Sequence, residues 1–380
     1  MRVLATCSLA AFLAAMDGSA LFLVLPAVAA EFHARLPSLS NLGSVVALGS
    51  IGALPLGILA DRRGRRLLVV LGTAGFGIAD LASAFAPSLA WLAAARVIAV
   101  VFETAVGEIA LIVVVEEMAA QHRGIGAAVL TLAAGAGAGF ITILYPFVAP
   151  HWQVLYVAGA AGLPAAFLIW WWLPESSAWE RARGLPALAW RGPWVRRLVI
   201  VVVAAALAEV FYGPVALFLA LYGSSDLHLR PAVISAVVIG AGLAGLAAYP
   251  VGGWLTDRYG RRGIGVGLAL GNAITAGVAF VGGFTPFVAG NVLFSALNSA
   301  SGPVFGAWYA ELFPTRARVT ADIFDVVAGA AGSVVGLQVL PRLDDRFGLG
   351  HGIAGLAVLA ICGALVLVLL PETRGQPLEA

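Results

Sequence analysis

Charged residues interrupt stretches of this sequence that are otherwise almost entirely apolar, and they are the residues that could carry chemistry. Removing a charge from water is costly, so such a residue needs an opposite charge, a hydrogen-bonding partner or a water-filled cavity. A carboxylate that pairs with an arginine in one conformation and loses it in another can bind and release a proton. The residues of this kind are Asp17, Arg96, Glu103, Glu108, Glu209, Asp322 and Asp325.

Helical spacing sorts the charges of the first half into faces. Arg96 and Glu103 are seven residues apart, which places them on one helix face, about two turns from each other. Both side chains can point toward the helix that holds Asp17. Glu108 is rotated by about 140° from Glu103 and is expected to face a neighbouring helix. We interpret Asp17 and Arg96 as a proton switch assisted by Glu103, and Glu108 as a further proton carrier or a solute contact. A static structural ion pair is the alternative.

A second group of residues defines the expected solute site. Asn298 follows Glu103 by 195 residues, and Asp322 and Asp325 share a helix face. The expected solute contacts are Glu209, Tyr212, Asn298, Trp308, Asp322 and Asp325. A proton carrier is the alternative for Glu209, and a solvated inner vestibule is the alternative for Asp322 and Asp325. Because many carboxylates accompany a single buried arginine, a cationic or neutral solute is favoured. Asp80 is expected at the outer, interfacial end of its helix, outside this site.

The composition places these charges in a membrane. Of the 380 residues, 61% are hydrophobic and only 11% are charged, against roughly 25% charged in a soluble domain. A transmembrane helix needs about 20 apolar residues. Twelve windows qualify, near 3–30, 39–60, 67–86, 90–115, 124–148, 152–173, 196–222, 231–256, 263–283, 286–310, 318–340 and 351–370. The predicted fold is therefore an all-α membrane protein with twelve transmembrane helices.

The distribution of arginine predicts the orientation. The chain has no lysine, and 17 of its 22 basic residues fall in segments that would be cytoplasmic if the N-terminus is inside. This excess predicts that both termini lie in the cytoplasm and that the chain is a multi-pass protein of the inner (plasma) membrane. The net charge of +2 gives no reason to expect a nucleic-acid partner.

The two halves of the sequence repeat. The segment from Gly57 to Arg66 recurs from Gly253 to Arg262, 196 residues later, and Pro174-Glu175-Ser176 recurs as Pro371-Glu372-Thr373, 197 residues later. Two pseudo-symmetric six-helix bundles follow, at 1–173 and 196–380, joined by a short cytoplasmic linker at 174–195. In transporters built this way the solute binds at the midplane, at the repeat interface.

The repeated motifs suggest a gate. Asp61 can accept hydrogen bonds from the N-terminal amides of a helix, Gly57 can allow close helix approach, and Gly64 can allow a tight turn. Glu116 can pair with Arg123, and Glu311 can pair with Arg318. The expected gating residues are Gly57, Asp61, Arg62, Gly64, Arg65, Glu116, Arg123, Asp257, Arg258, Arg261, Glu311 and Arg318. The alternative is that these charges only set the topology.

These motifs resemble those of the major facilitator superfamily along the whole chain. GILADRRGRR is similar to its signature loop between spans two and three. Arg96, Glu116 and Arg123, together with LPESSAW and LPETRGQPLE, resemble the branch of sugar porters, metabolite and aromatic-acid proton symporters and organic-cation carriers. Asp17-Gly18 is similar to the aromatic-acid symporters. The seventh span, AEVFYGPVALF, lacks the glutamine pair of sugar porters, which argues against a sugar.

Together these features predict a secondary active transporter that moves a small organic solute by alternating access, coupled to protons. A multidrug-type proton antiporter and an uncoupled facilitator are the alternatives. We expect no enzyme activity, because no nucleophile–base pair stands out, and no cofactor or metal, because no phosphate-binding loop or His–Cys cluster is present. The expected partners are the solute, protons and lipid, and the expected oligomeric state is a monomer.

Overall fold

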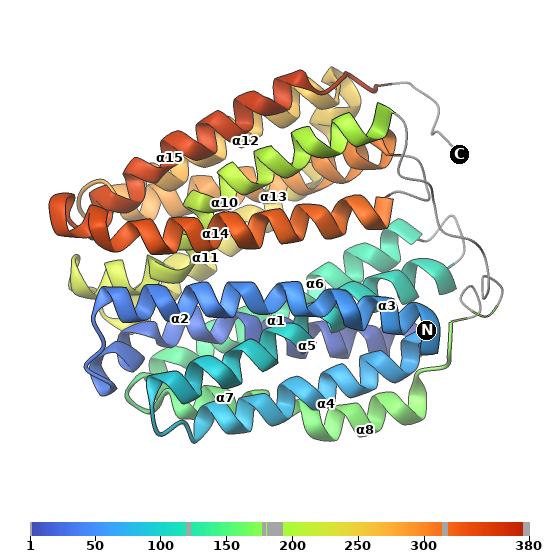
Figure 1. Ribbon diagram of the computed structural model, residues 1–380, viewed down its shortest axis with the longest axis horizontal. Helices are drawn as coiled ribbons and strands as arrows, with labels where there is room; N and C mark the ends of the chain where they lie inside the picture. The colour runs from blue at the N-terminus through green and yellow to red at the C-terminus, as the bar shows by residue number, and fades with distance from the viewer. Residues whose placement is uncertain (1, 119–122, 177–179, 181–192, 314–317, 375–380) are drawn as a thin grey trace. The chain divides into compact units, whose positions relative to one another are not determined.

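The computed structural model describes residues 2–118, 123–176, 180, 193–313 and 318–374, and regular structure there is helical, without strands. The chain divides into two compact units, Met1–Pro186 and Ala187–Ala380. Each unit is described by itself. In both, helices run roughly alongside one another, as expected of a bundle that crosses a bilayer (Figure 1).

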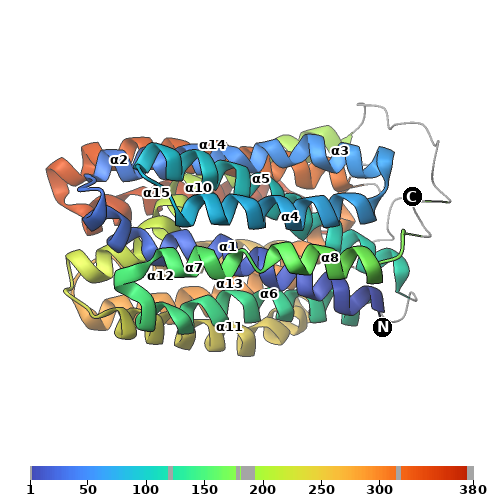
Figure 2. The ribbon, with the colours of Figure 1, turned by 90° about the horizontal axis from the view of Figure 1, so that it is seen from below.

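The first unit contains six helical passes. Four of them are single helices: α1 (Arg2–Glu31), α4 (Arg65–Ala84), α5 (Leu89–Glu117) and α6 (Arg123–Val148). The second pass is α2 (Leu36–Gly49) and α3 (Ala53–Arg63), joined by a 3-10 turn at Ser50–Gly52. The sixth is α7 (Gln153–Gly159) and α8 (Gly162–Trp172), which lie end to end (Figure 2).

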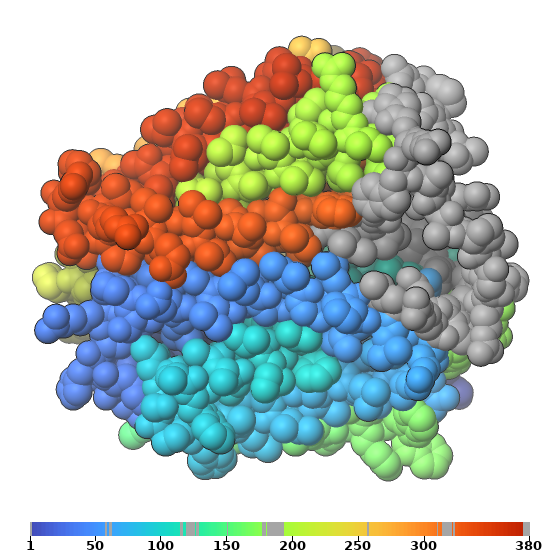
Figure 3. Space-filling view, in the orientation of Figure 1, coloured from blue at the N-terminus to red at the C-terminus, as the bar shows by residue number. Residues whose placement is uncertain are grey.

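The second unit also contains six helical passes. They are α10 (Pro193–Ser225), α11 (Pro231–Tyr259), α12 (Arg261–Val278), α13 (Phe284–Leu312), α14 (Arg318–Phe347) and α15 (Leu349–Val366). A 3-10 turn at Leu367–Leu369 continues the last pass. Figure 3 shows α10 and α14 side by side on one face of this unit, with their side chains in contact.

Within the described residues, ten helical segments are long and apolar enough to cross a membrane. The predicted spans at 263–283 and 286–310 form α12 and α13, which are not among these ten. Two arginines at the start of α12, with glycine and asparagine, dilute its apolar residues, and glycine, serine and asparagine dilute those of α13. The twelve predicted windows nevertheless correspond one by one to the twelve helical passes.

Close helix contacts repeat between the units. A Cβ atom added at Gly137 in α6 would come 2.0 Å from the carbonyl oxygen of Phe12 in α1. A Cβ added at Gly332 in α14 would come 2.1 Å from the carbonyl oxygen of Ala206 in α10. The two glycines are 195 residues apart. Small residues at such positions let helix backbones approach in a membrane, and here they do so between the same two passes of each repeat.

Candidate functional site

The centre of the first unit holds a buried arginine between two aspartates. Arg96 Nη1 lies 2.7 Å from Asp17 Oδ1 and 2.8 Å from Asp80 Oδ1. Arg96 is 1% exposed, Asp17 2% and Asp80 0%. The single guanidinium therefore ties together α1, α4 and α5. The contact between Asp17 and Arg96 is the pairing that the sequence predicted.

Asp80 corrects a prediction. The apolar window placed Asp80 at the interfacial end of its helix, yet its carboxylate is fully buried and Arg96 donates a hydrogen bond to it. Its surroundings explain this position, because the packed face of α4 also holds Thr73, Phe76 and Gly77. A helical wheel places Asp80 on that face, seven, four and three residues after them respectively, and this pattern could have revealed it.

Glu103 and Tyr156 complete the cluster. Arg96 Nη2 lies 4.0 Å from Glu103 Oε2, because both side chains reach along α5 toward each other. The centre of the guanidinium lies 4.9 Å from the centroid of the Tyr156 ring, a cation–π distance. Tyr156 in α7 is 1% exposed and gave no signal in the sequence. Three carboxylates thus share one guanidinium in the interior of the unit.

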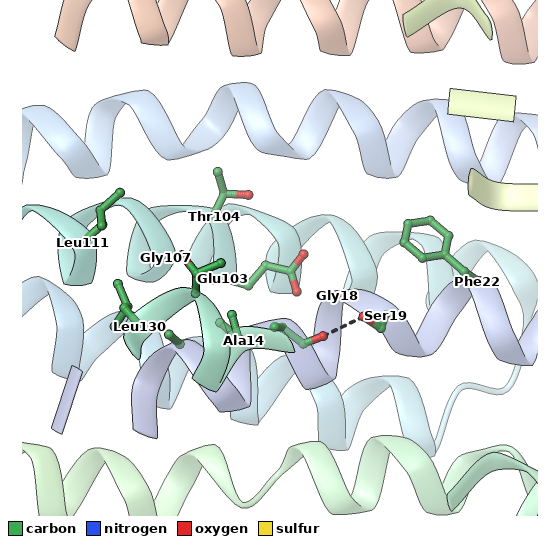
Figure 4. Close-up of a pocket in the computed structure, with 13 residues that line it drawn as sticks. Ala14, Gly18, Ser19, Phe22, Glu103, Thr104, Gly107, Leu111 and Leu130 are labelled. Carbon is green, nitrogen blue, oxygen red and sulfur yellow. Dashed lines mark hydrogen bonds between the residues drawn. The ribbon is translucent and has the colours of Figure 1, made fainter. Parts of the chain in front are cut away.

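An apolar cavity opens beside this cluster (Figure 4). It has a volume of about 440 Å³ and lies among α1, α5 and α6. Glu103 is the charged residue of its lining, and a Cβ added at Gly18 would lie 3.3 Å from both Glu103 carboxylate oxygens. The lining residues are Ala11, Ala14, Ala15, Gly18, Ser19, Phe22, Glu103, Thr104, Gly107, Leu111, Leu130, Thr131 and Ala134. A volume of this size suits a small organic molecule.

Glu108 lies outside this cluster. Its residue is exposed on α5, while Glu103 faces the cavity and the cluster. The predicted rotation between the two residues is therefore present in the structure. The described ion pairs of Arg96 are with Asp17, Asp80 and Glu103, and Glu108 is not among these partners.

The second unit gathers several of the predicted solute contacts. The Tyr212 ring stacks on Phe294 of α13 with the centroids 5.7 Å apart. Asn298 is exposed and lies four residues after Phe294, on the same face of α13. Glu209 packs against Gly329 of α14, one turn beyond Asp325, and the two carboxylates are close enough to interact electrostatically. The structure therefore groups these residues in one region of the unit.

Trp308 belongs to a different region. It is fully buried, its ring stacks on Phe305, and its Nε1 donates a hydrogen bond to the carbonyl oxygen of Pro371 at 3.1 Å. The sequence suggested a solute contact, but the indole instead fixes the chain that follows α15. Its apolar neighbours include Trp194 and Leu312. Trp308 is therefore a packing residue of this unit.

A carboxylate caps the N-terminus of α4, directly after a tight turn. Gly64 has φ +107°, which is the tight turn expected of it. The backbone N–H groups of Arg65 and Arg66 donate to Glu175 Oε1 at 2.8 and 3.2 Å. The sequence assigned this role to Asp61, whose side chain lies outside the described ones, and among the described residues Glu175 fills it. The repeated Pro-Glu-Ser/Thr motif was the signal that could have identified Glu175.

The second unit repeats this cap. Gly260 has φ +100°, and Arg261 and Arg262 donate from their backbone N–H groups to Glu372 at 2.9 and 3.0 Å. Partial burial acts to raise the pKa of the Glu372 carboxyl, but backbone hydrogen bonds, including those from Arg261 and Arg262, outweigh it and hold this pKa below its ordinary value. The four donors are the N–H groups of Arg261, Arg262, Thr373 and Arg374.

Glu311 has a partner that the sequence did not suggest. Its carboxylate pairs with Arg261, with Nη2 and Oε1 3.1 Å apart, and also accepts a hydrogen bond from the Thr373 hydroxyl. The side chain of the expected partner, Arg318, lies outside the described ones, so that pairing stays a prediction, whereas Arg261 begins α12 and is brought near by the bundle. The pair joins the start of α12, the end of α13 and the segment after α15.

The remaining predicted gating residues make fewer described contacts or lie outside the described side chains. Arg258 is exposed, and its guanidinium lies 5.6 Å from the Trp254 ring centroid. Gly57 does not mark a close approach, since no described atom lies within 4 Å of a Cβ added there. Arg65 contributes its backbone to the cap. Outside the described side chains lie those of Asp61, Arg62, Glu116, Arg123, Asp257, Arg318 and Asp322.

Comparison with known proteins agrees with this architecture. Residues 7–229 match the Major Facilitator Superfamily, and residues 182–380 match the family described as Sugar (and other) transporter. Among solved structures, the chain is similar to a D-xylose-proton symporter, with a TM-score of 0.78, 20% identity and 99% of both chains covered. It is also similar to a bacterial homologue of the human lysosomal transporter Spinster, with a TM-score of 0.78, 15% identity, and 97% and 96% coverage.

Sequence relatives are carriers of small metabolites. The putative niacin/nicotinamide transporter NiaP of Bacillus subtilis is 26% identical over 387 residues, covering 96% of this chain and 94% of that protein. The cis,cis-muconate transport protein of Acinetobacter baylyi is 25% identical, covering 97% and 95%. The gallate transporter of Pseudomonas putida is 32% identical over 142 residues, only 36% of this chain and 31% of that transporter.

Two repeat-related six-helix units, with charges buried inside an apolar bundle, define a multi-pass membrane transporter rather than an enzyme. The chain belongs to the major facilitator superfamily, and it is a transporter of small metabolites.

Proposed function

We propose that this transporter couples the movement of its solute to protons by alternating access, with Asp17 as the proton carrier and Arg96 as its switching partner. The observation that carries the proposal is the 2.7 Å contact between these two buried side chains. Within the membrane neither residue has bulk water to stabilise its charge, so each depends on the other. A conformational change that separates them would favour proton uptake by Asp17.

The balance of charge supports proton binding. Asp17, Asp80 and Glu103 surround one guanidinium, so full ionisation of all three would leave a net charge of −2 inside the unit. Uncompensated buried charge is strongly destabilising. The cluster is neutral when two of the three acids carry protons. Loss of one further proton leaves a net charge of −1, which favours the uptake of a proton by the cluster.

The solute we propose is a small metabolite that is neutral or cationic when it binds. The cavity of about 440 Å³ is largely apolar, and Glu103 is the charged residue of its lining. The relatives named for niacin, nicotinamide and cis,cis-muconate suggest small conjugated acids and their amides. An acid of this kind meets that condition in its neutral form, whose protonated carboxyl group can donate a hydrogen bond to Glu103.

We propose that the caps at Glu175 and Glu372 and the pair of Arg261 with Glu311 belong to the gate. These contacts lie at repeat-related turns, and charge pairs that form in one state and break in the other can act as a latch. The excess of arginine in the same loops supports a cytoplasmic location for these turns and for both termini. The membrane we propose is the inner membrane.

The test is transport in liposomes with a trapped pH-sensitive dye. Nicotinamide, benzoate-type acids and organic cations are added separately, to the wild type and to Asp17→Asn. A solute-dependent pH change in the wild type that disappears in Asp17→Asn supports the proposal. Solute flux without proton movement in the wild type would contradict it and identify an uncoupled facilitator. Proton exit coupled to uptake of many unrelated cations would indicate a multidrug-type antiporter.

A further inference from the structure

We propose that Asp80 is a fixed second counter-ion for Arg96, which holds the guanidinium in place and keeps its charge compensated while Asp17 exchanges the transported proton. This inference rests on the proposed proton coupling and adds to it a positioning residue. Asp80 does not line the cavity, and its role is expressed through Arg96.

The geometry of Arg96 Nη1 carries the inference. This one nitrogen lies 2.7 Å from Asp17 and 2.8 Å from Asp80. When Asp17 is protonated, the pair of Asp80 with Arg96 is electrically neutral and remains intact. Without Asp80, protonation of Asp17 would leave the buried guanidinium with Glu103 as its nearest carboxylate, at 4.0 Å rather than 2.8 Å, and a poorly compensated buried cation is costly. Asp80 therefore keeps the charge of Arg96 compensated while Asp17 is neutral in the buried interior of the unit.

The packing around Asp80 shows that its carboxylate occupies a space reserved for it. A Cβ added at Gly159 in α7 would come 2.0 Å from Asp80 Oδ2. The same oxygen is buried and has no hydrogen-bond partner among the described residues. Glycine at position 159 thus leaves room for the Asp80 carboxylate, which any larger residue there would displace. Such a space is expected if the carboxylate has a function.

The groups that face Asp80 come from three helices. They are Asp17 from α1, Arg96 and Glu103 from α5, and Tyr156 from α7. Among them Asp80 contributes one negative charge that opposes ionisation of Asp17. Removing this charge makes the ionised form of Asp17 more favourable. It also leaves Asp17 as the carboxylate nearest to the Arg96 guanidinium. Both effects mean that Asp17 takes up its proton at lower pH.

The experiment is the pH dependence of proton-coupled solute flux in liposomes for the wild type, Asp80→Asn and the control Asp345→Asn, whose residue is exposed at the end of α14. We expect the midpoint of Asp80→Asn to move to lower pH by on the order of one pH unit, from the Coulomb interaction of close charges in a protein interior. The midpoint of Asp345→Asn should match the wild type.

Two outcomes would overturn the inference. A folded Asp80→Asn protein that transports more slowly at every pH, with an unchanged midpoint, would make Asp80 a structural residue only. An unchanged rate and midpoint would make it dispensable. By contrast, a wild type that moves no protons would refute the proposed coupling itself, and this result is separable because it requires no variant.

A second variant keeps the test valid if Asp80→Asn does not fold. Gly159→Ala displaces the Asp80 carboxylate without changing any charge, and we expect a smaller shift of the midpoint in the same direction. Its control is Gly139→Ala, because no described atom lies within 4 Å of a Cβ added at Gly139. If Gly159→Ala and Gly139→Ala share the wild-type midpoint, the inference fails.

Discussion

Glu175 and Glu372, 197 residues apart in the sequence, make the same contact in the two units. Each carboxylate accepts hydrogen bonds from the first two backbone N–H groups of a helix, at 2.8 and 3.2 Å for Glu175 and at 2.9 and 3.0 Å for Glu372. In each case a glycine with positive φ precedes the helix. The duplication thus preserved a complete local structure together with its sequence motif.

The first prediction concerns the stabilising effect of these two caps. Glu175→Gln and Glu372→Gln remove the negative charge that favours the N-terminus of the following helix, while keeping an oxygen acceptor. Each should destabilise its unit by about 1 kcal/mol, which corresponds to a fall of about 2–4 °C in melting temperature. Thermal unfolding in detergent measures this, with Asp345→Asn as the control. A cap without an energetic role would leave both melting temperatures at the control value.

The second prediction is the pH dependence of the Glu372 cap. The pKa of this carboxyl lies below its ordinary value of about 4.3 because it accepts four backbone hydrogen bonds. The stabilisation is therefore fully present above pH 4.3 and is lost as the pH falls through the lowered pKa.

This sign has a measurable consequence for the melting temperature. The gap between the wild type and Glu372→Gln should be constant from about pH 7 to 5 and should shrink as the pH falls toward 3. Melting curves at matched ionic strength give the two values. A gap that grows on acidification would show that the ionised form of Glu372 is not the stabilising one.

The third prediction concerns the ion pair of Arg261 and Glu311. The two side chains are 13% and 15% exposed, and Thr373 donates to the same carboxylate. Removing one partner should cost more than a surface pair would, because the other charge is left partly buried. A double-mutant cycle with Arg261→Gln and Glu311→Gln should give a coupling energy of about 1–3 kcal/mol. Additive effects on stability would mean that the two residues do not stabilise each other.

The sequence predicted the helical passes better than the charged contacts. Apolar windows depend on the length that a bilayer imposes, so twelve passes could be counted from composition alone. Asp17 and Arg96 could be paired because few buried charges of opposite sign were available. Asp80 was missed because a window locates a residue along its helix and says nothing of which neighbours cover it.

Glu311 illustrates the same limit for ion pairs. Spacing along the chain favoured Arg318, whose side chain lies outside the described ones, and gave no sign of Arg261, which precedes Glu311 by 50 residues and pairs with it in the structure. Two helices of the bundle bring them together at one end. Contacts between helices that are distant in sequence depend on tertiary packing, which periodicity cannot supply.

The last prediction is that Glu103 sets the charge of the solute. Its carboxylate is the charged group of the cavity lining, next to Gly18 and the apolar wall formed by Leu111 and Leu130 (Figure 4). Glu103→Gln removes a negative charge that attracts cations and repels anions at close range. We expect the apparent affinity for an organic cation to fall about tenfold, an effect of about 1.4 kcal/mol.

The same variant should bind a carboxylate solute more tightly and respond less to pH, because glutamine donates its hydrogen bond without first taking up a proton. Competition of a panel of acids, amides and amines against the best transported solute measures both effects. Thr104→Ser, which also alters the lining but keeps its charge, is the matched control. Equal shifts for cations and anions in Glu103→Gln would mean that this residue shapes the cavity without selecting the charge of the solute.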